Sequence, residues 1–154
     1  MNNIYAFEQL LNNTGLKFSR KNSERGNTIF EIFNVVAEGN RVYQNIEELE
    51  YGNILNRTFI TFYQAGHVMI ETDFILRLNI TKDRQKLALL DELNDLNNRY
   101  SIVKFSFLNN NVRAAVSVLD PTDLQSNVIS KFFTSIAIMY REEHSIKERV
   151  WLAS

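Results

Sequence analysis

The clearest pattern of hydrophobic and polar positions lies between residues 81 and 119, where a helical periodicity is followed by two alternating segments. Apolar residues recur at helical spacing through Leu87, Leu89, Leu90, Leu93 and Leu96. Thr81 suits the N-cap of this helix, and Asp83 places an acid in its first turn. The more solvated side carries Asp91, Glu92 and Asp95. The pattern therefore predicts an amphipathic helix.

Two β-hairpins are predicted around this helix. The later one pairs strands at 102–108 and 112–119, and Asn109-Asn110-Asn111 suits its turn because asparagine tolerates positive φ. The earlier one pairs 57–64 with 67–76 and turns at Ala65-Gly66. Its second strand has a polar face at Glu71 and Asp73, which is typical of an antiparallel sheet that is wet on one side.

The first third of the chain predicts a short helix over 4–13, a polar and partly basic segment over 17–27, and a strand over 28–37. Both faces of that strand are largely apolar, which favours a central position or cover on both sides. The segment 41–56 is predicted to be a mostly irregular insertion with about one helical turn, in which Val42 and Tyr43 could form a short strand.

A long helix is predicted after Asp120-Pro121-Thr122-Asp123. Asp120 suits the N-cap, Pro121 the first helical position and Asp123 an acidic first turn. Apolar residues then recur every fourth position at Leu124, Val128, Phe132, Ile136 and Tyr140, and the stripe is widened by Ile129, Phe133 and Met139. The helix should run for roughly 25 residues or more, and a stripe of this length often meets a partner or a second copy of the chain.

The element order is α-β-β-β-α-β-β-α, and 154 residues is the length of a single domain, 1–154. Helices do not alternate with single strands along the chain, so a doubly wound parallel sheet is not expected. We therefore predict an α+β fold, with an antiparallel sheet of about five strands and helices packed mainly on one face.

Composition narrows the function classes. Hydrophobic residues make up 45% of the chain, which is enough for a packed core, and a net charge of −1 gives no general attraction to nucleic acid or anionic membranes. Without cysteine, disulfides, thiolate metal sites and a cysteine nucleophile are excluded. The first residues lack a basic start and an apolar signal core, so we expect a cytoplasmic location.

No catalytic or cofactor motif is present. His67 and His144 are far apart in the sequence, which argues against a metal site. Glu71 and Asp73 share a strand face and invite acid–base chemistry, although a solvated strand face explains them as well. The five glycines form no phosphate-binding loop, and the basic cluster Arg20, Lys21 and Arg25 is interpreted as a solvated loop. We expect no enzymatic activity, cofactor or metal.

Three segments carry a family resemblance: 89–97, 103–107 and 112–116. They resemble the YbjN family and, more distantly, the class I type III secretion chaperones. Asn94 or Asn97 stands where the helix-ending asparagine of that pattern falls, and Lys104-Phe105 stand at its strand pair. The resemblance implies a helix-flanked antiparallel sheet, commonly dimeric, that binds other proteins and has no enzymatic site. In the secretion chaperones, a non-globular segment of an effector wraps around hydrophobic patches.

The first functional hypothesis is thus a non-enzymatic protein-binding module, chaperone-like or regulatory, that acts as a homodimer. Its partner would be another protein or an unfolded segment of one, with no nucleic acid and no membrane. The predicted contact residues, which equally suit a core, are Phe132, Phe133, Ile136 and Tyr140. The alternatives are a small-molecule-responsive regulatory domain with a pocket between sheet and helices, an enzyme using Glu71 and Asp73, and a viral or accessory protein that antagonises a host.

Overall fold

The computed structural model describes residues 3–119 and 125–154 and confirms the predicted α+β class. Its helices are α1 (Asn3–Asn13), α2 (Ile46–Glu50), α3 (Asp83–Arg99) and α4 (Gln125–Leu152). Its strands are β1 (Ser19–Asn22), β2 (Thr28–Phe33), β3 (Val35–Glu38), β4 (Arg41–Gln44), β5 (Asn56–Phe62), β6 (Val68–Phe74), β7 (Lys104–Leu108) and β8 (Asn111–Val118). The main antiparallel sheet has six strands in the order β1-β2-β5-β6-β8-β7, one more than predicted, and β3 pairs with β4 in a small second sheet.

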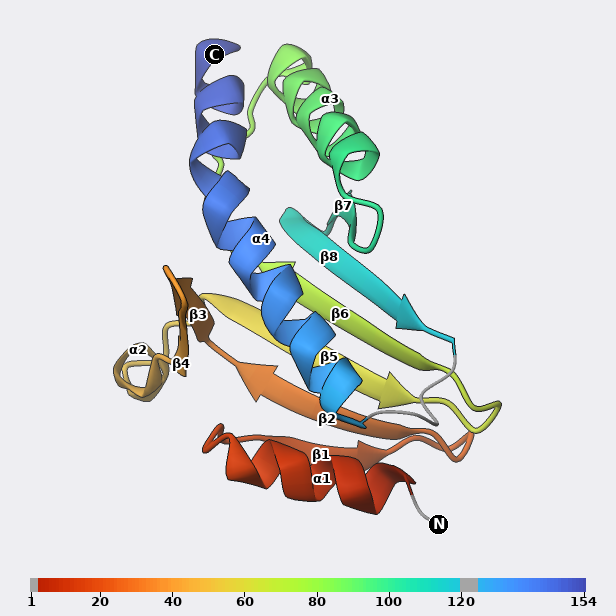
Figure 1. Cartoon of the computed structure of the whole chain (residues 1–154). Coiled ribbons are helices and arrows are strands. Elements are labelled where there is room, and N and C mark those ends of the chain that lie inside the picture. The colour runs from red at the N-terminus through yellow and green to blue at the C-terminus, as the bar shows by residue number, and fades with distance from the viewer. Residues whose placement is uncertain (1–2, 120–124) are drawn as a thin grey trace.

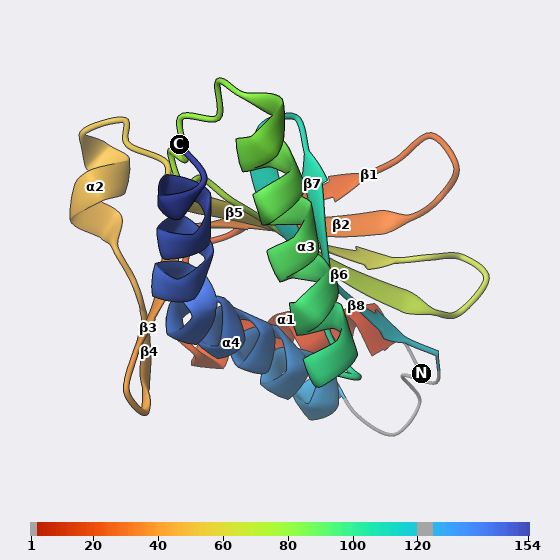
Figure 2. The same cartoon turned by 90° about the horizontal axis from the view of Figure 1, so that it is seen from above.

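Helices α1, α3 and α4 lie on one face of the main sheet, and α4 crosses that face diagonally (Figure 1). Figure 2 shows that none of the helices in residues 3–119 and 125–154 covers the opposite face. Alternate residues of the inner strands turn toward the helices and form the core with α4, as expected for period-2 side-chain alternation. Fully buried examples are Phe30, Ile60, Ile70, Phe74, Phe132 and Ile136. The main sheet is therefore covered on one side only.

The predicted strand over 28–37 is two strands because the chain breaks at Asn34. This residue has a φ of 56°, in the left-handed region that asparagine tolerates better than most residues. Its side chain donates to the carbonyl of Asn53 at 2.8 Å and accepts from the amide of Leu55 at 2.7 Å. These hydrogen bonds stabilise the left-handed conformation of Asn34, which ends β2. As a result β3 leaves the main sheet and pairs with β4.

The segment 41–56 is more regular than the predicted mostly irregular insertion, although its short strand and its helical turn were both expected. The segment contains β4, α2 and the first residue of β5. Asn45 caps α2, since its side chain accepts a hydrogen bond from the amide of Glu48 at 3.1 Å. The polar segment over 17–27 likewise contains β1, an exposed edge strand paired with β2, which has no buried face for the hydrophobic pattern to reveal.

Helix α3 begins at Asp83, and its N-cap is Lys82 rather than Thr81. The side-chain oxygen of Gln85 accepts hydrogen bonds from the amides of both residues, at 2.9 and 3.0 Å. The buried stripe is formed by Leu89, Leu93 and Leu96, whereas Leu87 and Leu90 are exposed. Glu92, predicted to be solvated, is buried because Arg149 and Ser145 of α4 bind its carboxylate.

Both predicted hairpins are confirmed as β5–β6 and β7–β8. Asn109 and Asn110 have φ values of 52° and 65°, which is the geometry of a tight two-residue turn. The predicted long final helix is also confirmed, since α4 has 28 residues. The predicted cap residues Asp120, Pro121 and Asp123, together with Leu124, lie outside the described residues.

Candidate functional site

The four contact residues predicted on α4 face the protein's own core. Phe132 and Ile136 are fully buried, so in this conformation they are not available to a partner. Phe133 and Tyr140 are partly buried and pack against the same core. The Tyr140 hydroxyl accepts a hydrogen bond from the side-chain amide of Asn56 at 3.1 Å, and burial raises the pKa of Tyr140 to about 12. The stripe that predicted an interface thus builds the core.

Glu71 and Asp73 lie on the helix-free face of the sheet, where Arg113 of β8 binds both. Its guanidinium contacts Asp73 at 2.7 and 3.1 Å and Glu71 at 3.0 Å. Arg113 is directly opposite Asp73 in the β6–β8 register, so one cation satisfies both carboxylates. The arrangement is an ion-pair network on an open strand face, and it explains both acids structurally.

A second network on this face involves Glu31, which is nearly buried. Burial by itself would raise the pKa of Glu31, but hydrogen bonds from Arg57 and Lys21 outweigh it and lower the pKa below its usual 4.5. A lowered folded-state pKa contributes stability above the unfolded-state value, and this contribution is lost as the pH falls through the folded-state pKa.

We expect Glu31→Gln to flatten the acid dependence of stability. The wild-type free energy of unfolding should fall more steeply than that of the variant as the pH drops below the usual glutamate pKa of 4.5 and through the lowered pKa of Glu31. Urea unfolding at a series of pH values measures this difference. Glu24→Gln, an exposed change in the β1–β2 turn, should follow the wild-type curve. Parallel wild-type and Glu31→Gln curves would contradict the assignment.

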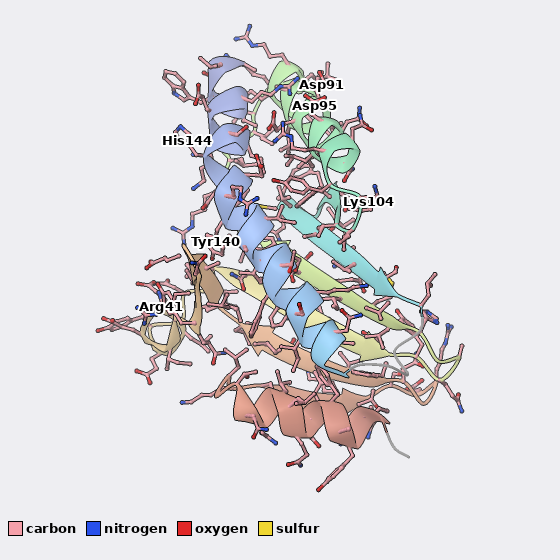
Figure 3. All side chains as sticks on the ribbon, viewed as in Figure 1. Arg41, Asp91, Asp95, Lys104, Tyr140 and His144 are labelled. Atoms are coloured by element: carbon pink, nitrogen blue, oxygen red, sulfur yellow. The ribbon has the colours of Figure 1, made fainter. Side chains whose placement is uncertain are left out.

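The two histidines have separate local partners. His67 stacks on Tyr63 with ring centroids 4.4 Å apart, and His144 contacts Glu148 at 3.2 Å. Figure 3 shows His144 on α4, one helical turn beyond Tyr140. Within residues 3–119 and 125–154, no group of three or more metal-ligating side chains is arranged to hold an ion.

A large hollow lies beside the C-terminal half of α4 and has a volume of about 1010 Å³. On one side it is lined by Leu55 and by residues 75–79, the chain that leaves β6. The other side is formed by α4 through Glu143, His144, Lys147, Glu148 and Trp151. We call this hollow the α4 groove. Trp151 is 71% exposed at its rim, and Ile75 is 37% exposed, so the groove presents apolar surface to solvent.

The chain that borders the α4 groove, 75–81, belongs to no helix or sheet. Its burial alternates as in a strand: Leu76, Leu78 and Ile80 are turned inward, while Arg77 and Asn79 are exposed. Among the described residues, no hydrogen bond involves the backbone N–H or C=O groups of residues 76–80. Backbone polar groups require partners, so these are open to water or to a bound chain. Arg77 and Asn79 have φ values of 54° and 52°, which for arginine is uncommon.

The two acids of the α4 wall each have a partner one turn away, a lysine for Glu143 and a histidine for Glu148. Lys147 contacts Glu143 at 3.0 Å and His144 contacts Glu148 at 3.2 Å, each one turn apart on α4. Arg77 has no ion pair in the part of the chain that the structure describes. The groove therefore combines an apolar floor, unpaired backbone groups and one unpaired cation.

The outer edge of the main sheet at β7 is less open to an added strand than the backbone of residues 76–80 is. The side-chain amide of Asn97 on α3 donates to the carbonyl of Phe105 at 2.9 Å and accepts from the amide of Phe105 at 2.6 Å. Asn97 thus takes the place of a neighbouring strand at Phe105, which protects the edge. This clamp is the physical role of the asparagine noted in the sequence.

Sequence reasoning missed the groove because its walls come from four separated parts of the chain. One local signal was present: the alternation of Phe74, Leu76, Leu78 and Ile80 continues past the end of the predicted strand at 76. A strand pattern that outruns its hairpin partner indicates an extended chain with unpaired backbone.

Comparisons with protein families, curated proteins and solved structures find no match. The resemblance to the YbjN family therefore stays a prediction. Of the helices in the described residues, none has both the length and the apolar character needed to cross a bilayer.

Proposed function

We propose that the chain is a non-enzymatic protein-binding module whose α4 groove holds an extended segment of another polypeptide. The observation that carries the proposal is the unpaired backbone of residues 76–80 beside an apolar groove. An extended partner can hydrogen-bond to such a chain while its alternate side chains enter the groove, as in other modes of strand addition.

Exposed apolar residues around the groove support this proposal. Ile75, Trp151 and Leu152 are exposed at or next to its rim, and Ile54 is exposed next to the lining residue Leu55. Large exposed aromatic residues commonly anchor protein partners. Chaperone-like and regulatory roles both fit a groove that receives an unfolded segment.

Binding to a permanently unfolded protein tests the proposal. We expect reduced, carboxymethylated lactalbumin to bind the chain and native lactalbumin not to bind, because only the unfolded form offers extended segments. Trp151→Ala should weaken binding about tenfold, as for loss of an aromatic anchor. Tyr5→Ala removes an equally exposed aromatic from α1 and should leave affinity unchanged.

Hydrogen exchange of the complex locates the contact. The amides of residues 76–80 should gain protection when the unfolded protein binds, because their N–H groups acquire partners. Binding that is insensitive to Trp151→Ala and leaves these amides unprotected would contradict the proposal.

A small-molecule-responsive domain is the second candidate, and the size of the hollow favours it. A volume of about 1010 Å³ is at the upper end of the range for small-molecule sites. A ligand that binds only the folded chain must raise its melting temperature. A metabolite that raises the melting temperature of the wild type but not that of Trp151→Ala would favour the small-molecule-responsive domain over the protein-binding module.

A further inference from the structure

Hollows follow the chain from Ile75 into the first turn of α3. Beyond the α4 groove lies a hollow of about 310 Å³ that shares Arg77, Leu78 and Asn79 with it. A third hollow, of about 260 Å³, shares Ile80 and Phe107 with the second and reaches Lys82 and Lys86. In Figure 2 this stretch passes beside the C-terminal end of α4 and then turns into α3. The three hollows therefore line nearly the whole segment from Ile75 to the first turn of α3.

Positive charge is in excess along these hollows. Arg77, Lys82 and Lys86 line them, and none forms an ion pair within the described ranges 3–119 and 125–154. The acids among the same lining residues are Glu143, which pairs with Lys147, Glu148, which contacts His144, and Asp83 in the first turn of α3, where the helix dipole stabilises it. The chain as a whole has a net charge of −1, so this local excess is a property of the segment.

Inward and exposed side chains alternate along the segment, although Arg77 and Asn79 have left-handed φ values and the segment is not a regular strand. Leu76, Leu78 and Ile80 form an inward row, while Arg77 is turned outward between them. In an extended partner, successive side chains point to opposite sides. One set can therefore lie on the apolar floor while the other faces the cations.

We infer that the α4 groove selects an extended, acidic segment of another protein in which apolar and acidic residues alternate, and that Arg77 is a specificity-determining residue for it. This inference rests on the proposed function and adds the chemistry of the partner. The backbone of the partner segment would hydrogen-bond to residues 76–80. Its apolar side chains would contact Leu76, Leu78 and Trp151. Its carboxylates would contact Arg77, Lys82 and Lys86.

Nucleic acid fits these observations less well. Its recognition needs a broader basic face with several stacking aromatics, whereas Trp151 is the exposed aromatic among the described lining residues of the α4 groove. A second copy of the chain also fits less well, because its acidic stretch Ile46–Glu50 is held as helix α2 and is not extended.

Fluorescence polarisation with three labelled octapeptides tests the inference. The probes are capped alternating peptides of Glu-Leu, Ser-Leu and Lys-Leu repeats. The Glu-Leu peptide should bind about tenfold more tightly than the Ser-Leu peptide, and the Lys-Leu peptide should bind most weakly, because several modest charge contacts add. The advantage of the Glu-Leu peptide should shrink as salt is raised.

Arg77→Glu should remove the preference for the Glu-Leu peptide, and Arg77→Asn should reduce it while keeping a residue type that tolerates a φ of 54°. The matched control is Arg25→Glu, which makes the same charge change at an exposed position in the β1–β2 turn. It should leave the order of affinities intact.

The outcomes separate the two proposals. If all three peptides bind equally, or if Arg77→Glu leaves their order unchanged, the acidic partner is wrong and the peptide groove stands. If none binds, the proposed function fails with it. Light scattering that shows a dimer which Trp151→Glu converts to a monomer, without peptide binding, would mean that a second copy covers the groove and would overturn the inference.

Discussion

Replacing Phe132 with alanine is expected to lower the free energy of unfolding by about 3–5 kcal/mol, as for other buried phenylalanines. The Phe132 side chain is fully buried under α4, against the sheet and beside Phe133 at 5.5 Å between ring centroids. The substitution removes apolar contacts and leaves a cavity that the packed surroundings cannot close. Urea unfolding followed by circular dichroism measures the loss.

Phe133→Ala is the matched comparison, since the neighbouring side chain is only partly buried. We expect a smaller loss, of about 1–2 kcal/mol, because part of the Phe133 ring is already in water. Binding of the unfolded protein by folded Phe132→Ala should equal that of wild type. A Phe132→Ala variant with wild-type stability and lost binding would restore the contact role predicted from the sequence.

The hairpins and the long last helix could be predicted because their signals are local. Alternation in β5 and β6, positive-φ asparagines in the β7–β8 turn and the four-residue spacing of α4 all act within a few residues. The break at Asn34 could not be predicted, since it depends on bonds to Asn53 and Leu55, about twenty positions away. Local patterns specify elements, whereas long-range hydrogen bonds decide where an element ends.

Which face of a helix is buried likewise depends on the element that packs against it. The sequence pattern assigned Leu87 and Leu90 to the apolar stripe of α3, yet they are exposed, while Glu92 is buried. The reason is that α3 meets α4 through ions: Arg149 contacts Glu92 at 2.8 Å and Asp95 at 2.7 Å. A buried acid paired with a distant arginine has no sequence signature.

These same contacts position the candidate site. Arg149 lies on the C-terminal half of α4, which also forms one wall of the α4 groove, and Glu142 on that helix binds Arg99 and Tyr100. The ion pairs and the hydrogen bond between these parts of the chain therefore hold the α4 wall of the groove in place relative to residues 75–81, which lead into α3. The groove arises from tertiary packing, so it could not be read from any single stretch of sequence.

Replacing Asn56 with alanine is expected to lower the free energy of unfolding by about 3 kcal/mol or more, because two buried backbone groups would lose their partners. Asn56 is fully buried. Its side chain accepts from the amide of Val35 at 3.1 Å and donates to the carbonyl of Val35 at 2.9 Å. It also donates to the hydroxyl of Tyr140 at 3.1 Å. One side chain thus ties β3, β5 and α4 together.

A graded series separates these bonds. Tyr140→Phe removes only the hydroxyl partner and should cost about 1 kcal/mol, while Asn40→Ala, an exposed asparagine in the β3–β4 turn, should cost close to nothing. Hydrogen exchange should show that Asn56→Ala exposes the amides of β3 and β4 first, because Val35 is the first residue of β3. Equal losses for Asn56→Ala and Asn40→Ala would mean that the small sheet is held by apolar packing on α4 rather than by Asn56.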